Sequence, residues 1–337
     1  MSRRVRETIS SNHFFSPKMI TLAIFLVLFF ANDQLSFSEA QLQFGFYSKT
    51  CPSAESIVRN IVQQAITRDP GNAAVLLRLH FHDCFVEGCD GSILIKHDVN
   101  DDERFAGGNA GLGGFDVIDE AKSELERVCP GVVSCADIVT LAARDAVVEA
   151  KGPFYEVPTG RRDGLIANMR NAANLPDVED SVNTLKSKFR EKGLSDKDLV
   201  LLSAGAHTIG TTACFFVMPR LDAQDPTINP EFFKVLRSKC PQGGDVNVRI
   251  PLDWESQFVF DDQIFRNIKN GKGVILSDSV LYQNNDMKKI IDSYLANNRS
   301  LKANFAADFA KAMVKMSAIG VKVGVQGQIR RICSATN

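Results

Sequence analysis

The sequence lacks an excess of charge of either sign, because 39 basic residues stand against 40 acidic ones and the formal net charge is −1. It therefore lacks the broad positive field that attracts nucleic acid. Its 23 glycines and 12 prolines follow no period, which excludes collagen-like and low-complexity chains. What it has is an apolar content of 45% over 337 residues, enough to bury a large core and to exclude a disordered chain.

A membrane-spanning run is also absent. A helix that crosses a bilayer needs about 20 apolar residues, and the apolar stretch over residues 19–31 is shorter than that. Basic residues precede this stretch, and Ser38 and Ala40 are small residues of the kind that signal peptidase accepts at −3 and −1. We expect residues 1–40 to be a signal peptide and residues 41–337 to be one secreted domain with no membrane span. The alternative is an N-terminal anchor that holds the same body outside the cytosol.

No two cysteines have the CxxC spacing, which disfavours a zinc ribbon or a thioredoxin motif. In an oxidising compartment the even number favours four disulfides, but spacing alone leaves about a hundred pairings open. The triplet Asn298-Arg299-Ser300 is an N-glycosylation sequon, which would fit a secreted surface loop. The eight cysteines are Cys51, Cys84, Cys89, Cys129, Cys135, Cys214, Cys240 and Cys333.

Apolar residues recur every three or four positions through most of the chain, which predicts a mainly α-helical protein. Ser195 and Asp198 resemble a capping box at a helix start, and Gly193 and Gly320 lie where helices end. Strand signals are sparse, and only residues 321–325 and 328–331 suggest a small hairpin. The predicted helices cover residues 54–68, 73–85, 115–128, 136–150, 182–192, 196–206, 230–239, 287–296 and 303–319.

The first group of chemically useful residues lies in the sequence LRLHFHDC at residues 77–84. On a helix Arg78 and His82 are four residues apart and share one face, whereas His80 points elsewhere. A neutral imidazole can move a proton while a guanidinium stabilises negative charge on a nearby oxygen. The alternative is a buried histidine whose hydrogen bonds are satisfied and which takes no part in chemistry.

The residues just after the LRLHFHDC segment, together with its Asp83, offer hard oxygen ligands for a metal ion. Asp83, Asp90 and Ser92 offer the carboxylate and hydroxyl oxygens that calcium prefers, and Gly88 and Gly91 allow tight turns between them. The spacing is not that of an EF-hand. The alternative is an ordinary acidic surface loop.

His207 ends an apolar segment and is surrounded by small residues, which would let a flat cofactor approach an axial histidine ligand. Asp278 is a candidate acceptor for the other ring N–H. Thr208, Asp253, Ser256 and Asp261 offer a second set of hard oxygens. The alternative is a packed core histidine.

With these residues together, the chain resembles the secretory plant peroxidases, the class III family of haem peroxidases, and within them the peroxidase 43 subgroup. The resemblance runs from FGFY at residues 44–47 to QGQIR at residues 326–330. Its strongest motifs are residues 78–89, VSCAD at 133–137, GRRDG at 160–164 and AHTIG at 206–210. It implies a mainly α fold with haem between a distal and a proximal lobe, minor short β-hairpins and four disulfides.

The resemblance also implies roles for single residues. His82 would be the distal acid–base residue with Arg78 as its partner, and Phe81 would wall the peroxide pocket. Asn109 would accept the other N–H of His82 and Glu103 would support Asn109. His207 would be the iron ligand held by Asp278, and Pro158 would lie where donors dock. The disulfides implied are Cys51–Cys129, Cys84–Cys89, Cys135–Cys333 and Cys214–Cys240.

Two calcium ions and one haem b are the cofactors that the resemblance implies. The distal calcium would bind Asp83, Val86, Gly88, Asp90 and Ser92, and the proximal calcium would bind Thr208, Asp253, Ser256, Val259 and Asp261. The family usually has Thr-Pro where this chain has Ser256-Gln257, so we expect a weaker proximal site because the backbone is freer without proline.

The function implied is reduction of hydrogen peroxide to water with one-electron oxidation of phenolic donors, such as lignin- or suberin-type wall phenolics, in a response to oxidative stress. A monomer secreted to the apoplast or cell wall is the family expectation. Three alternatives stay open: a secreted haem-binding protein without turnover, a calcium-stabilised structural protein of the wall, and a zinc hydrolase. His80 and His82 suggest the last, but the HExxH spacing is missing.

Overall fold

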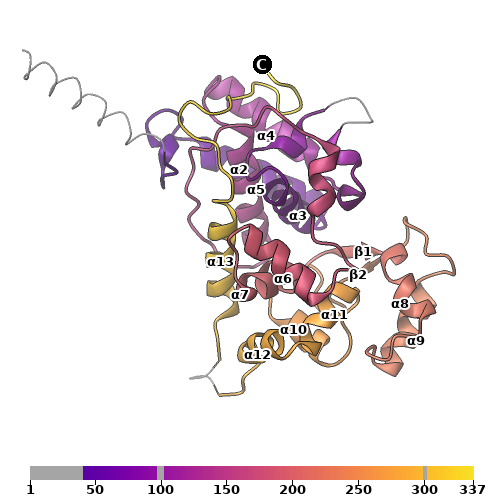
Figure 1. Ribbon diagram of the computed structural model, residues 1–337. Coiled ribbons are helices and arrows are strands. Elements are labelled where there is room, and N and C mark those ends of the chain that lie inside the picture. Colours follow the sequence, from indigo (N-terminus) through magenta and orange to yellow (C-terminus); the bar gives the residue numbers. More distant parts are fainter. Residues whose placement is uncertain (1–40, 97–101, 299–301) are drawn as a thin grey trace, which may run out of the picture. The chain divides into compact units, whose positions relative to one another are not determined.

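Helices dominate the structure, a computed structural model that describes residues 41–96, 102–298 and 302–337 (Figure 1). The expected signal peptide and the alternative anchor fall on residues 1–40, which lie outside the described residues. Residues 42–337 form one unit by their internal contacts, and the description below concerns this unit. Within the described residues no helix is both long enough and apolar enough to cross a membrane.

Four helices pack together in the N-terminal part of this unit, drawn in indigo to magenta in Figure 1. They are α2 (Ala54–Arg68), α3 (Asn72–Phe85), α4 (Phe115–Val128) and α5 (Cys135–Glu149). Helix α5 contacts the other three and is buried from its first residue to Val147. Its charged residues Asp137, Arg144 and Asp145 are buried in ion pairs. The Ser134 hydroxyl accepts a hydrogen bond from the Asp137 amide at 3.1 Å and caps the start of α5.

The C-terminal part is built from shorter segments. Helix α7 (Asp196–Val200) continues as the π-helical segment η7 (Leu201–Gly205) and the 3₁₀ turn η8 (Ala206–Thr208). A capping box of Ser195 and Asp198 starts α7, as predicted. Around η7 pack α10 (Gln263–Lys269), α11 (Leu276–Gln283) and α13 (Phe305–Met316). The remaining helices of this part are α6 (Val182–Glu191) and α12 (Asn285–Tyr294).

A smaller apolar cluster lies around α8 (Met218–Asp222) and α9 (Pro230–Lys239), which contact each other (Figure 1). Its members include the disulfide-bonded Cys214 and Cys240. Two three-residue strands, β1 (Thr211–Ala213) and β2 (Arg249–Pro251), pair antiparallel with Thr212 opposite Ile250. The short 3₁₀ turns are η2 (Phe46–Ser48), η3 (Ser92–Leu94), η4 (Glu103–Phe105), η5 (Gly107–Asn109), η6 (Met169–Asn174) and η9 (Cys214–Phe216).

The mainly α fold is confirmed, and all four expected disulfides form: Cys51–Cys129, Cys84–Cys89, Cys135–Cys333 and Cys214–Cys240. Two expectations are wrong. The helix predicted over residues 196–206 is not a continuous α-helix, since it changes to π and then 3₁₀ geometry after Val200. The hairpin predicted within residues 321–331 does not form, because Lys322 and Gln328 bridge instead to Arg162 and Asp163.

Candidate functional site

Helix α3 places Arg78 and His82 one turn apart on the same face. His82 is buried, and its Nδ1 lies 2.7 Å from Oδ1 of Asn109, which ends η5. The Asn109 amide nitrogen donates to the backbone carbonyl of Glu103 at 2.8 Å. That bond orients the amide so that its oxygen faces the histidine. Nδ1 of His82 therefore carries the proton, and Nε2 is left with a free lone pair.

Burial sets the protonation state of this pair. It lowers the pKa of His82 to about 3, and the positive charge of Arg78 adds to the lowering, while the Asn109 hydrogen bond acts in the opposite direction. Burial and then the charge of Arg249 lower the pKa of Arg78 to about 10, so the guanidinium stays charged at neutral pH. The site holds a neutral imidazole beside a cation, which is the combination that proton transfer to and from an oxygen requires.

Aromatic rings pack along the same helix. Phe81, half-buried, stacks on Phe85 with ring centroids 4.1 Å apart, and Phe85 in turn contacts Phe189 of α6 at 4.9 Å. The ring of Phe81 lies edge-on to His82, with centroids 5.8 Å apart. An apolar wall thus lies next to the imidazole.

His80 has different surroundings from His82. It is fully buried, burial lowers its pKa to about 3, and its Nδ1 lies 3.5 Å from Sγ of Cys84. Cys84 is bonded to Cys89, so the three side chains cannot act together as a thiolate metal site. His80 and His82 do not converge, and the zinc alternative loses its basis.

The end of α3 and the loop after it gather buried oxygens. These residues, 83–92, are called the distal loop from here on. Asp83 Oδ2 accepts the Gly91 amide at 3.0 Å, while Asp83 Oδ1 and Ser92 Oγ are buried with no hydrogen-bond partner among the described residues. Asp90 Oδ1 accepts the Ser92 amide, and Asp90 Oδ2 pairs with Lys322 Nζ at 2.8 Å. Burial and the neighbouring Asp90 charge raise the pKa of Asp83. Unpartnered buried oxygens beside excess negative charge fit a divalent cation.

Two backbone carbonyls expected in the distal loop already have donors. The Val86 carbonyl accepts Lys192 Nζ at 3.0 Å, and the Gly88 carbonyl accepts the Asp90 amide at 2.8 Å. A carbonyl oxygen has two lone pairs, so each can accept a further ligand.

His207 lies in η8, and its Nδ1 is 3.0 and 3.1 Å from the two carboxylate oxygens of the buried Asp278, in the first turn of α11. No described residue hydrogen-bonds to Nε2 of His207, and 31% of the side chain is exposed. With Nδ1–H donated to a carboxylate, Nε2 is an electron-rich ligand atom. This donor chemistry fits axial binding of a haem iron.

The proximal loop, residues 253–261 together with Thr208, gathers a second set of oxygens. The hydroxyls of Thr208 and Ser256 donate to Asp261 Oδ1 at 3.3 and 3.1 Å. Asp253 Oδ1 accepts two backbone amides, whereas its Oδ2 is buried and has no partner in the part of the chain that the structure describes. Val259, 42% exposed, offers only its backbone. The expected ligands thus lie close together, and an unpartnered carboxylate oxygen again fits a cation.

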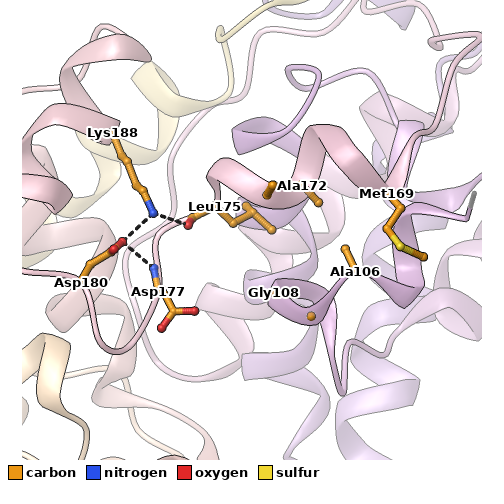
Figure 2. Close-up of a pocket in the computed structure, with 10 residues that line it drawn as sticks. Ala106, Gly108, Met169, Ala172, Leu175, Asp177, Asp180 and Lys188 are labelled. Atoms are coloured by element: carbon orange, nitrogen blue, oxygen red, sulfur yellow. Dashed lines mark hydrogen bonds and ion pairs between the residues drawn. The ribbon is translucent and has the colours of Figure 1, made fainter.

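A cavity of about 410 Å³ is lined in part by Gly108, the residue before Asn109 in η5, and sequence reasoning did not find it (Figure 2). At one end Lys188 binds Asp180 Oδ2 and the Leu175 carbonyl at 2.7 and 2.8 Å. No local signal marks it, because η5 and η6 meet only in the folded chain. The cavity is lined by Ala106, Gly107, Gly108, Met169, Ala172, Ala173, Leu175, Asp177, Asp180 and Lys188.

Pro158 does not belong to the lining of this cavity. Its carbonyl accepts Arg161 Nη1 at 2.7 Å, next to the buried ion pair of Arg161 and Asp137. Asn298 is exposed after α12, while the other two residues of its sequon lie outside the described residues.

A mainly helical fold with four disulfides, a buried histidine bonded to an amide and a partly exposed histidine bonded to a carboxylate fits the class of haem peroxidases. Comparison agrees: the family model described as Peroxidase matches residues 58–297, and the chain belongs to that family. Membership implies a haem cofactor, hydrogen peroxide and an electron donor.

More narrowly, the chain is a plant class III peroxidase. It is 83% identical over 319 residues to Peroxidase 13 of Arabidopsis thaliana, covering 95% of this chain and all of that protein. It is 54% identical to Peroxidase 43 of the same plant over 94% of this chain and 97% of that protein. Peroxidase N1 of Nicotiana tabacum is 47% identical over 95% and 97%. Of these relatives, Peroxidase 13 is more similar to the chain than the expected Peroxidase 43.

Proposed function

We propose that His82, Arg78 and Asn109 carry out the proton chemistry of this peroxidase. The observation that carries the proposal is the chain from the Glu103 carbonyl through Asn109 to His82, which leaves Nε2 as a base. Haem bound through His207 would supply the redox chemistry. Nε2 of His82 would take the proton from the near oxygen of the peroxide and return it to the far one. Arg78 would stabilise the negative charge that develops as the O–O bond breaks.

Asp278 would hold His207 as the axial ligand. Its two carboxylate oxygens accept a hydrogen bond from Nδ1–H of His207. This bond fixes the ring orientation and raises the basicity of Nε2. Phe81 would line the peroxide side and keep water out.

Two calcium ions would bind the distal and proximal loops through the oxygens already described. The support is the unpartnered buried oxygens, Asp83 Oδ1 and Ser92 Oγ in one loop and Asp253 Oδ2 in the other. The serine at position 256 keeps a hydroxyl directed at Asp261, so ligation survives without the usual threonine.

Small phenols would dock near Pro158 to donate electrons, as the family resemblance implies, and the cavity lined by Gly107 and Gly108 is a second candidate for donor binding. The cavity lies beside Gly108, the residue before Asn109, has apolar walls at Met169 and Leu175, and is large enough for an aromatic ring. The physiological role would be oxidation of wall phenolics and removal of hydrogen peroxide. The enzyme would act as a monomer in the apoplast after cleavage behind Ala40, which mass spectrometry of the secreted protein tests directly.

A double-mutant cycle tests the proton chain. His82→Leu and Asn109→Leu are compared singly and together for the rate at which one equivalent of peroxide changes the Soret band. Because Asn109 acts through His82, Asn109→Leu slows the wild-type reaction about tenfold and has no further effect in the His82→Leu background. Additive effects would show that Asn109 acts by another route, and the proposal would fail.

A further inference from the structure

A second arginine, Arg249, is near enough for its charge to act on Arg78, and it has no acidic partner among the described residues. Arg249 begins β2, and its Nε and Nη2 donate to the hydroxyl and the carbonyl of Thr211, each at 2.8 Å. Arg78 donates to the carbonyls of Gly108 and Ala110. Among residues 41–96, 102–298 and 302–337, no carboxylate forms an ion pair with either guanidinium. Neutral acceptors thus hold both cations.

The backbone explains how Arg249 comes near α3. Gly210, just before β1, has φ +97°, and a Cβ placed on it would lie 2.5 Å from Cβ of Ala74. The β1 strand therefore starts in direct contact with α3. Ala74 and Arg78 are one turn apart on the same helix face. The next residue, Thr211, accepts the hydrogen bonds of the Arg249 side chain. The second guanidinium therefore lies on the side of α3 that bears Arg78.

The electrostatics agree with this placement. The charge of Arg249 contributes to the lowered pKa of Arg78, after burial. Two cations held close together without a counter-ion repel each other and attract an anion. Arg249 is exposed, so a ligand can reach it, and the planar fork of arginine matches a carboxylate.

We propose that Arg249, held by Thr211 beside the Arg78 face of α3, is a carboxylate-binding residue of this enzyme. The inference rests on the proposed function of the Arg78–His82 site. Two carboxylates share the required chemistry: a propionate of the haem, or the acid group of an anionic phenolic donor. In either case Arg249 acts on binding and selectivity, while His82 and Arg78 carry the proton chemistry.

The first arm of the test measures donor selectivity. Ferulate and coniferyl alcohol share the same phenolic ring, but only ferulate carries a carboxylate at neutral pH. If the donor is the ligand, Arg249→Gln raises KM for ferulate about tenfold and leaves KM for coniferyl alcohol within twofold. Arg249→Lys keeps the positive charge but not the planar guanidinium, so its KM for ferulate falls between those of wild type and Arg249→Gln. Arg331→Gln, which removes an exposed arginine elsewhere, matches the change in net charge and has no selective effect.

The second arm measures haem retention. Holoenzyme is prepared with haem or with haem dimethyl ester, and release to excess apomyoglobin is followed at the Soret band. If a propionate is the ligand, Arg249→Gln releases haem several-fold faster than wild type, and the difference disappears with the dimethyl ester. Donor selectivity then stays unchanged.

A carboxylate-dependent effect in either arm supports the inference and identifies the source. The inference is overturned if Arg249→Gln changes neither arm, or if it affects ferulate and coniferyl alcohol equally with unchanged haem release. Failure of the proposed function would differ, since wild-type holoenzyme would then not respond to peroxide with either donor.

Discussion

The two histidine sites of this peroxidase are built in different ways. Arg78 and His82 lie on one continuous helix, so their spacing alone puts them on one face. His207 follows a segment that changes from α to π to 3₁₀ geometry, and its partner Asp278 comes from another helix. Local helical order therefore positions the candidate proton-transfer residues, whereas tertiary packing positions the candidate iron ligand.

The hydrogen-bond partners differ in charge as well. His82 bonds to a neutral amide, and burial beside a guanidinium keeps its imidazole neutral. His207 bonds to a carboxylate, which increases the electron density on its other nitrogen. The first arrangement suits a base that must start unprotonated, and the second suits a ligand to a metal.

The largest effects should separate the two sites. His82→Leu is expected to lower the rate of the peroxide reaction by about 10²- to 10⁴-fold, because it removes the general acid–base group, while the Soret band of bound haem stays. His207→Ala is expected to weaken haem retention and alter the resting Soret band before any peroxide is added. Stopped-flow and static absorbance distinguish these results. Loss of haem from His82→Leu with normal retention in His207→Ala would reverse the assignment.

The variant Asp278→Asn tests whether the negative charge next to His207 matters. The amide keeps the shape but loses the negative charge, so the imidazole becomes a weaker donor to iron. We expect haem release to rise by about 10- to 100-fold and the reduction potential of the bound iron to increase. Haem transfer to apomyoglobin and a redox titration measure both. An unchanged potential would show that the carboxylate only orients the ring.

Substitutions at the candidate calcium loops should have smaller effects. Lys322 pairs with Asp90 in the distal loop, so this ammonium competes with a bound cation for the carboxylate. Lys322→Met should tighten calcium binding by about tenfold at most, since the lysine is partly exposed and screened. Lys322→Arg is the charge-conserving control. Calcium titration monitored by thermal unfolding measures the change, and weaker binding in Lys322→Met would contradict the competition.

The smallest effect concerns pH. Because the pKa of His82 is lowered to about 3, its neutral form persists down to that pH, and kcat/KM for peroxide should vary less than twofold between pH 5 and 7.

The free energy of unfolding, in contrast, should depend on pH. The unfolded histidines protonate near their ordinary pKa of about 6.5, so buried neutral His80 and His82 favour the folded state above that value and lose this contribution as pH falls towards 3.

Rate and unfolding temperature measured over one pH series check both statements. An acid limb in kcat/KM near pH 6.5, with the protein still folded, would show that burial does not keep His82 neutral.

Regular helices with clear end signals could be predicted closely from the sequence. Helices α2, α4 and α9 have the bounds expected from periodicity, and α9 begins at Pro230 behind the capping Asn229. The change after Val200 could not be predicted, because the same apolar spacing suits an α-helix and a π-helical segment. The β1–β2 pair has three residues a strand and a long connection, which leaves no local signal.

The candidate site shows the same division. The pairing of Arg78 with His82 follows from helical spacing, and the hard oxygens of both loops can be recognised from residue types. The Asn109–His82 bond and the four disulfide pairs came from family resemblance, and all of these except Cys84–Cys89 join segments distant in sequence. Asp278 could be named as a candidate acceptor from its residue type, but its contact with His207 depends on tertiary packing. The cavity beside Gly108 and the position of Arg249 depend on tertiary packing and needed the structure.

One absorbance experiment tests the central claim, that a neutral His82 and a haem-binding His207 work together. The secreted protein is purified with haem and calcium supplied, one equivalent of hydrogen peroxide is added, and then guaiacol. We predict a Soret band that shifts with peroxide and returns with guaiacol. A Soret band that ignores peroxide would contradict the roles of Arg78, His82 and Asn109, and folded protein with no Soret band would contradict haem binding at His207.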